Sequence, residues 1–166
     1  MPNHPFFKIY LIFAVAAALL YCLPVYFFIL AADYTRSWLL YLGNFLFMIV
    51  TGVFLFYISR YRQSNPGMMG FIILGEKQVL RSTALALFFS FILLIILVPG
   101  FFEKGPAGRI IVNQPANTIH DKSNGLIFMV IVNAAISNFI TGSFASEILS
   151  ASLNNKAQKG KKLKQT

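Results

Sequence analysis

The stretch that decides the fold covers residues 9–32, which read IYLIFAVAAALLYCLPVYFFILAA and contain no charged residue. As a helix it would be about 36 Å long at 1.5 Å of rise per residue, which is enough to cross the ~30 Å hydrocarbon core of a bilayer. It lacks the alternation of a barrel strand, and it exceeds the ~7–15 residues of a signal-peptide core. We therefore expect a retained transmembrane helix.

Three further apolar runs of similar length follow, at residues 38–59, 82–102 and 126–146. A helix satisfies every backbone hydrogen bond within its own segment, as a lipid environment requires. The sequence therefore predicts an all-α polytopic membrane protein with four transmembrane helices. We expect residues 1–153 to form one domain, followed by a Lys-rich cytoplasmic tail at 154–166.

The composition agrees with lipid as the solvent. Hydrophobic residues make up 57% of the chain and charged residues only 11%, whereas soluble domains are roughly 25% charged. The net charge of +9 does not indicate nucleic-acid binding, because the cations are not interleaved with stacking aromatic residues. They lie instead in short segments between and after the apolar runs.

The Lys and Arg residues predict the orientation. The N-terminal segment, the 60–81 connection and the tail together hold ten of them, against four in the 33–37 turn and the 103–125 loop. Cytoplasmic loops are enriched in Lys and Arg. We therefore expect both termini in the cytoplasm, and an even number of helices agrees because it places both termini on one side.

The two longer connections have features of their own. Residues 68–75 are apolar but too short to cross a membrane, which predicts an interfacial elbow before the third helix, with a re-entrant loop as the alternative. In the 103–125 loop, residues 109–112 are expected to form a short strand or a lip packed on the bundle.

Catalytic and metal-binding constellations are not recognisable in the sequence. None of the four runs contains a charged residue, and the acidic residues near them lie at predicted helix ends, namely Asp33, Glu76, Glu103 and Glu147. Ionisable groups inside the membrane usually mark proton or substrate pathways. We therefore expect no enzyme, no cofactor and no metal site.

The strongest polar signal is a stripe on the fourth helix. Asn133, Ser137 and Thr141 recur every four residues, with Asn138 beside them, so they share one helical face. In lipid such a face must turn toward other helices or toward trapped water. Asn44 and Thr51 of the second helix are the predicted partners. The stripe therefore predicts helix packing, or alternatively a face for a small solute.

A second set of candidate residues is expected to contact anionic lipid of the inner leaflet. Cations next to a bilayer attract such lipid by roughly 1 kcal/mol each. The set lies in the tail and after the second helix and consists of Lys156, Lys159, Lys161, Lys162, Lys164, Arg60 and Arg62.

The layout resembles small four-helix inner-membrane protein families of Gram-negative bacteria whose function is unknown. The shared features are a tight first hairpin, an apolar elbow with glycines and a longer outer loop. Gly70, Ile72, Leu74 and Gly75, ahead of Glu76, carry the resemblance. It implies a topology and a location in a bacterial inner membrane, and it supplies no activity or functional residue.

From these observations we expect a non-catalytic small subunit or scaffold of a membrane assembly. Its partners would be the bilayer and a membrane protein or a second copy of the chain. The alternative is a small oligomeric transporter or channel that uses the polar face of the fourth helix.

Overall fold

Long apolar runs without internal breaks become long helices in the computed structural model, which describes residues 5–61, 67–98, 101, 111–113 and 125–162. The helices are α1 (Pro5–Ala31), α2 (Trp38–Tyr61), α3 (Gly67–Leu97), α4 (Gly125–Val132) and α5 (Asn138–Lys162). A 3₁₀ turn, η1 (Tyr34–Arg36), joins α1 to α2, and a π-helical turn, η2 (Asn133–Ser137), joins α4 to α5. The prediction of four helices long and apolar enough to cross a membrane is confirmed.

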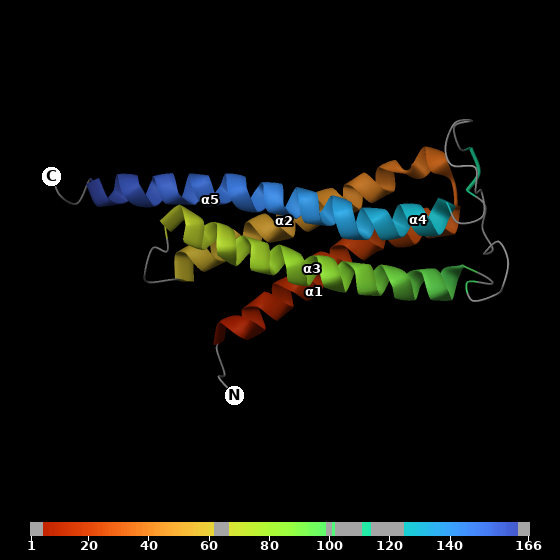
Figure 1. Cartoon of the computed structure of the whole chain (residues 1–166), viewed down its shortest axis with the longest axis horizontal. Helices are drawn as coiled ribbons and strands as arrows, with labels where there is room; N and C mark the ends of the chain where they lie inside the picture. Colours follow the sequence, from red (N-terminus) through yellow and green to blue (C-terminus); the bar gives the residue numbers. More distant parts are fainter. Residues whose placement is uncertain (1–4, 62–66, 99–100, 102–110, 114–124, 163–166) are drawn as a thin grey trace.

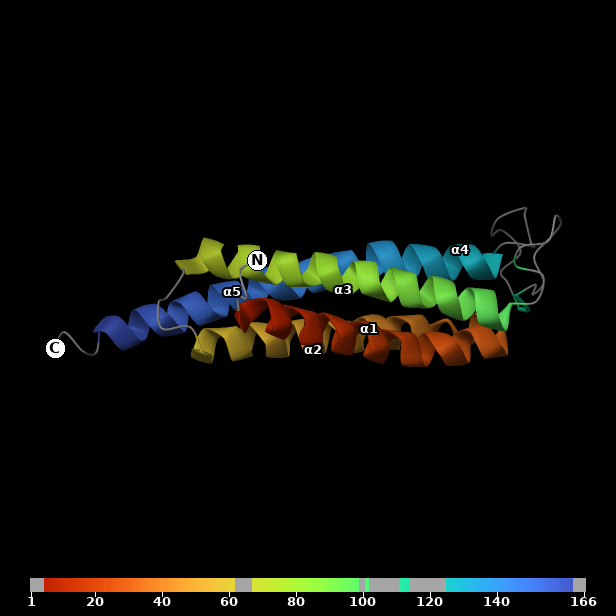
Figure 2. The same ribbon diagram turned by 90° about the horizontal axis from the view of Figure 1, so that it is seen from below.

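The helices form an antiparallel bundle in which each has two main neighbours. Helix α1 packs against α2 and α3, and α5 packs against the same two helices from the opposite side. Helix α1 begins and α5 ends at one end of the bundle, which we call the terminal end (Figure 1). The opposite end, the loop end, contains the α1–α2 turn. A view from below shows α5 extending farthest at the terminal end (Figure 2).

The predicted elbow at residues 68–75 is wrong, because these residues form the first turns of α3. The helix begins at Gly67, whose φ of +71° lies in the left-handed region, and it continues unbroken to Leu97. The apolar character of this stretch serves helix packing, because Phe71 is buried among the ends of α2 and α5. A short apolar stretch was thus the start of a packed helix, and the third helix lies at 67–97 in place of the predicted 82–102.

The fourth helix also extends beyond its predicted end at residue 146. Helices α4 and α5 with the π turn between them run from Gly125 to Lys162, so the predicted tail is helical over most of its length. Leu153 is buried against the terminal end of the bundle and anchors this extension. Polar composition alone could not show that neighbouring helices would support these turns.

A contact between loops closes the loop end. Helix α1 stops where Ala32 takes a φ of 47°, and Val112 then pairs with this turn through hydrogen bonds from Tyr34 N to Val112 O and from Val112 N to Ala32 O, each 3.0 Å long. The neighbouring Ile111 is buried in the core. The predicted lip is therefore present at 111–112, while residues 109–110 lie outside the described residues.

Asp33 orders the same turn through its carboxylate. Its Oδ1 accepts hydrogen bonds from the backbone N–H of Thr35 at 2.9 Å and from Asn113 Nδ2 at 3.1 Å. These hydrogen bonds, that of Thr35 first, lower the pKa of Asp33 below its usual value, because they favour the charged form. The first hairpin and the long loop are thus joined by one carboxylate.

Candidate functional site

The polar groups inside the bundle are the candidate site. Burying a polar group among apolar helices costs free energy unless the group is hydrogen-bonded, and polar residues inside a membrane are often functional. In the half of the bundle near the loop end, Tyr21 of α1 donates a hydrogen bond from Oη to Asn133 Oδ1 at 2.9 Å. Both side chains are buried. The contact joins the first helix to the last across the bundle.

Asn133 begins the π turn, and this turn changes the predicted stripe. The backbone N–H of Asn138 bonds to Asn133 O, five residues earlier, so these two asparagines occupy successive turns of the same face. The buried face then continues at a spacing of four through Gly142, Ser146 and Ser150. Ser137 and Thr141, which straight α-helical spacing had placed with Asn133, are only half-buried.

The other stripe residues bond mainly within their own helices. Thr141 Oγ1 donates to Ser137 O at 2.8 Å, and Asn138 Nδ2 donates to Ala134 O at 3.2 Å. Thr51 Oγ1 likewise donates to Phe47 O of its own helix at 3.2 Å. Asn44 is buried, and its Oδ1 has no partner among the described residues. The predicted bonds from Asn44 and Thr51 to the stripe are therefore not among the described contacts.

A second polar contact joins α3 to α5 toward the terminal end. Ser143 Oγ donates to Glu76 Oε2 at 2.8 Å, while Glu76 Oε1 is buried without a partner in the described part of the chain. Gly75 lies beside Ser146, whose Oγ is 3.5 Å from Ile72 O. The sequence placed Glu76 at a helix end, and its position inside α3 corrects that prediction. Gly75, a small residue next to a carboxylate, was the one available signal for a close crossing.

A third contact joins α3 to α1 and was not predicted. Gln78 is fully buried, and its amide oxygen faces the N–H of Ala14 at 2.8 Å while its nitrogen faces Tyr10 O at 3.1 Å. These two backbone groups lie four residues apart in α1, as the partners of a helical hydrogen bond do, so the Gln78 side chain contacts the main chain of α1. One turn later, the Arg81 guanidinium lies over the Tyr10 ring, 4.6 Å from its centre.

The single cysteine belongs to the buried packing. Cys22 Sγ lies 4.0 Å from both Ala86 O and Ser90 Oγ of α3. Across the described ranges, no group of three or more His, Cys, Asp or Glu is placed to hold a metal ion. The arrangement therefore offers hydrogen-bond donors and acceptors between helices.

The predicted lipid contacts lie at the terminal end, where the structure describes few of them. Arg60 is exposed in the last turn of α2. Lys156, Lys159, Lys161 and Lys162 belong to the helical part of α5 but their side chains are not among those described, and Arg62 and Lys164 lie outside the described residues.

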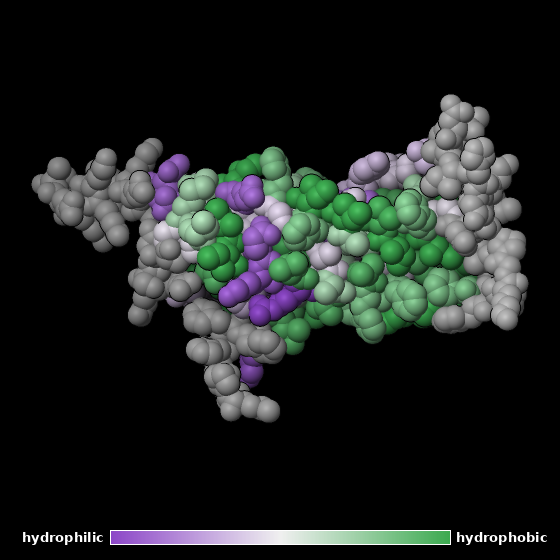
Figure 3. Space-filling view, in the orientation of Figure 1, coloured by the Kyte–Doolittle hydropathy of each residue, from purple (hydrophilic) through white to green (hydrophobic). Residues whose placement is uncertain are grey.

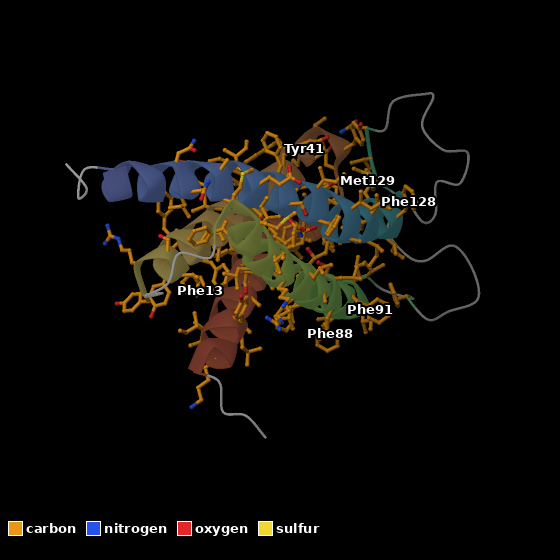
Figure 4. The ribbon with its side chains drawn as sticks, turned by 60° about the vertical axis from the view of Figure 1, so that its left-hand side comes forward. Phe13, Tyr41, Phe88, Phe91, Phe128 and Met129 are labelled. Carbon is orange, nitrogen blue, oxygen red and sulfur yellow. The ribbon has the colours of Figure 1, made fainter. Side chains whose placement is uncertain are left out.

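Two apolar grooves mark the outer surface of α3. The α1/α3 groove, of about 260 Å³, is lined by Tyr10, Leu11, Ala14, Arg81, Ala84 and Leu85. The α3/α4 groove, of about 490 Å³, is lined by Ala84, Leu87, Phe88, Phe91, Ile127 and Ile131. Phe88 and Phe91 project from α3, and Phe128 lies on α4 (Figure 4). Ala84 is common to both grooves.

Comparisons of the chain with protein-family models, with curated proteins and with solved structures find no match.

Proposed function

We propose that this chain is a multi-pass protein of a bacterial inner membrane, with both termini cytoplasmic, that acts as a non-catalytic small subunit or scaffold of a membrane assembly. The four apolar helices support the membrane location. The excess of Lys and Arg on the segments of the terminal end supports the orientation. The use of the interior polar groups in contacts between helices supports a structural role.

The length of α3 and α5 carries this proposal. Helix α3 has 31 residues and is therefore about 46 Å long, well beyond the ~30 Å that lipid requires. At the terminal end it packs on α5, where Phe71 and Leu153 belong to one buried cluster and Gly75 lies close to Ser146. The packed ends of α3 and α5 therefore extend together beyond the hydrocarbon core, where they can bind a partner.

The start of α3 is a suitable surface for a partner. Met68, Met69 and Ile73 are 44%, 69% and 48% exposed, and the exposed Lys77 lies one turn further along. Lys77 is expected near the headgroups, so the apolar surface before it faces the cytoplasmic side of the membrane. Methionine side chains adapt their shape to a partner. We therefore assign the docking of another membrane-associated chain or of a second copy to Met68, Met69 and Ile73.

The experiment compares the full-length chain with the double variant Met68→Gln/Met69→Gln, both extracted from their native membrane in mild detergent. Mass measurement by light scattering should show the wild-type chain in a stoichiometric complex that the double variant no longer forms. Ser152→Gln, at an exposed position on α5, is the matched control and should keep the complex. A monodisperse wild-type monomer would contradict the scaffold proposal.

A second candidate function is a small oligomeric transporter or channel, which the unpartnered buried oxygens favour. Asn44 Oδ1 and Asn138 Oδ1 are both buried without a partner in the described ranges. Such acceptors can bind water or a solute that donates hydrogen bonds. Efflux of K⁺ and osmotic water flow from proteoliposomes test this function. Asn44→Leu/Asn138→Leu should abolish the flux, and wild-type vesicles as tight as protein-free ones would exclude these probes as solutes.

A further inference from the structure

We propose that the outer face of α3 binds one anionic phospholipid, with the phosphate at Arg81 and the acyl chains in the α1/α3 and α3/α4 grooves. This site is separate from the tail cations and from Arg60. It depends on the chain lying in a bilayer and does not depend on the scaffold role.

The headgroup position follows from the charges at the terminal end of the α1/α3 groove. Arg81 is exposed, stacks on Tyr10, and forms no ion pair with a carboxylate among the described residues. Stacking on an aromatic ring holds a guanidinium in place and leaves its N–H groups free for a phosphate. Lys77, four residues earlier, is exposed on the same side of α3. An anionic headgroup therefore complements the groove at this end.

A third cation completes this end of the site. Lys8 is exposed and precedes Leu11, which lines the groove, by three residues, so the two side chains share a face of α1. A band of hydrophilic residues crosses the terminal half of α3, with apolar surface from there toward the loop end (Figure 3). The surface thus has the polarity of an amphiphile, charged at one end and apolar beyond it.

The length of the apolar part matches one leaflet. From Arg81 to Phe91 the grooves follow ten residues of α3, or about 15 Å along the helix axis, which is half of the ~30 Å hydrocarbon core. The α1/α3 groove covers the part beside Arg81, Ala84 and Leu85, and the α3/α4 groove continues from Ala84 to Phe91, so the two grooves together reach through the inner leaflet.

Ala84 explains how one lipid reaches both grooves. It is exposed and lines each of them, and its small side chain leaves a low crossing point over α3. The larger side chains of Leu87 and Phe88, one turn further along α3, line the α3/α4 groove. One chain can follow the α1/α3 groove while the other crosses Ala84.

The test is native mass spectrometry of the full-length protein in detergent, titrated with phosphatidylglycerol or with phosphatidylcholine. We expect the wild-type chain to bind one phosphatidylglycerol more tightly than any phosphatidylcholine. Arg81→Gln should weaken that binding at least about fivefold, since one cation near a lipid surface contributes about that factor. Arg36→Gln removes an exposed cation at the loop end, outside both grooves, and should change it less than twofold. Circular dichroism checks that each variant is folded.

A second variant tests the acyl chains. Ala84→Phe fills the crossing point on an exposed position and should weaken phosphatidylglycerol binding although Arg81 is intact. Glycerol phosphate, which has the headgroup but no chains, should not compete. Equal losses for Arg81→Gln and Arg36→Gln would overturn the site, as would effective competition by glycerol phosphate. Dimers that Ala84→Phe disrupts, with lipid binding unchanged, would identify the face as an interface between copies and overturn the proposal.

Discussion

Replacing Gly75 by alanine should loosen the contact between α3 and α5. A Cβ at Gly75 would overlap Ser146 Oγ and lie 2.9 Å from Ser146 Cβ. Ser146 is fully buried, so its side chain has no open space into which to turn. Because two atoms of a buried side chain are overlapped, the cost lies in the upper part of the overpacking range, at about 2–3 kcal/mol, while alanine gains about 1 kcal/mol over glycine in a helix. We expect the overlap to prevail, with a net loss of about 1–2 kcal/mol of unfolding free energy.

The rescue is the sharper part of this prediction. Ser146→Gly removes both overlapping atoms, and it gives up the long 3.5 Å contact to Ile72 O and the better helix propensity of serine. The double variant Gly75→Ala/Ser146→Gly should therefore recover most of the stability, with a coupling energy of about 1–2 kcal/mol between the two positions. Unfolding of the detergent-solubilised chain in SDS, followed by circular dichroism, measures each free energy.

The matched control is Ser152→Gly, which makes the same substitution at an exposed position two turns further on α5. It adds the helix cost of glycine without touching Gly75, so it should not rescue Gly75→Ala. If Gly75→Ala leaves stability unchanged, or if Ser152→Gly rescues it as well as Ser146→Gly, the close crossing of α3 and α5 is refuted.

Two further predictions concern the polar contacts. Tyr21→Phe leaves Asn133 Oδ1 buried without its donor and should lower the unfolding free energy by about 1–2 kcal/mol. Tyr26→Phe, at an exposed tyrosine, is the control and should leave it unchanged. Equal unfolding free energies of the two variants in SDS would contradict the contact. Because the folded pKa of Asp33 is lowered, its contribution to stability is present above the unfolded value of about 4 and is lost as the pH falls further. The protection factor of the Thr35 backbone amide, which is its exchange rate compared with the intrinsic rate at the same pH, should therefore fall in that range in wild type and not in Asp33→Asn. Identical pH profiles of the protection factor would refute the role of the carboxylate.

Sequence reasoning located all four spans because hydropathy is a property of each segment alone, and lipid selects on it directly. The residues at which the helices begin and end were harder to predict from the sequence. Residues 68–75 are apolar enough for an interface and equally suited to a packed helix, and only the burial of Phe71 in a cluster that includes Leu153 of α5 decides for the helix. The polar tail could not reveal that it continues α5.

The polar stripe was predicted in part. Asn133 and Asn138 are buried as expected, but the π turn between them rotates the following turns and moves Ser137 and Thr141 toward the surface. A constant helical period contains no sign of such a turn. Gln78 was not predicted and Glu76 was placed at a helix end, because both lie in what looked like a polar connection and their partners lie in helices distant in the sequence.

The sequence by itself determined three features: the suitability of the chain for lipid, the number of helices long and apolar enough to cross a membrane, and the distribution of charge between the two ends. Each of these follows from composition along one segment. Only the tertiary structure decided which polar groups meet. The contacts of Tyr21 with Asn133 and of Glu76 with Ser143 join residues 112 and 67 positions apart, and helix packing selects such pairs through close fit at small residues such as Gly75. Hydropathy is summed along the chain, whereas a hydrogen bond requires two particular atoms to be brought together.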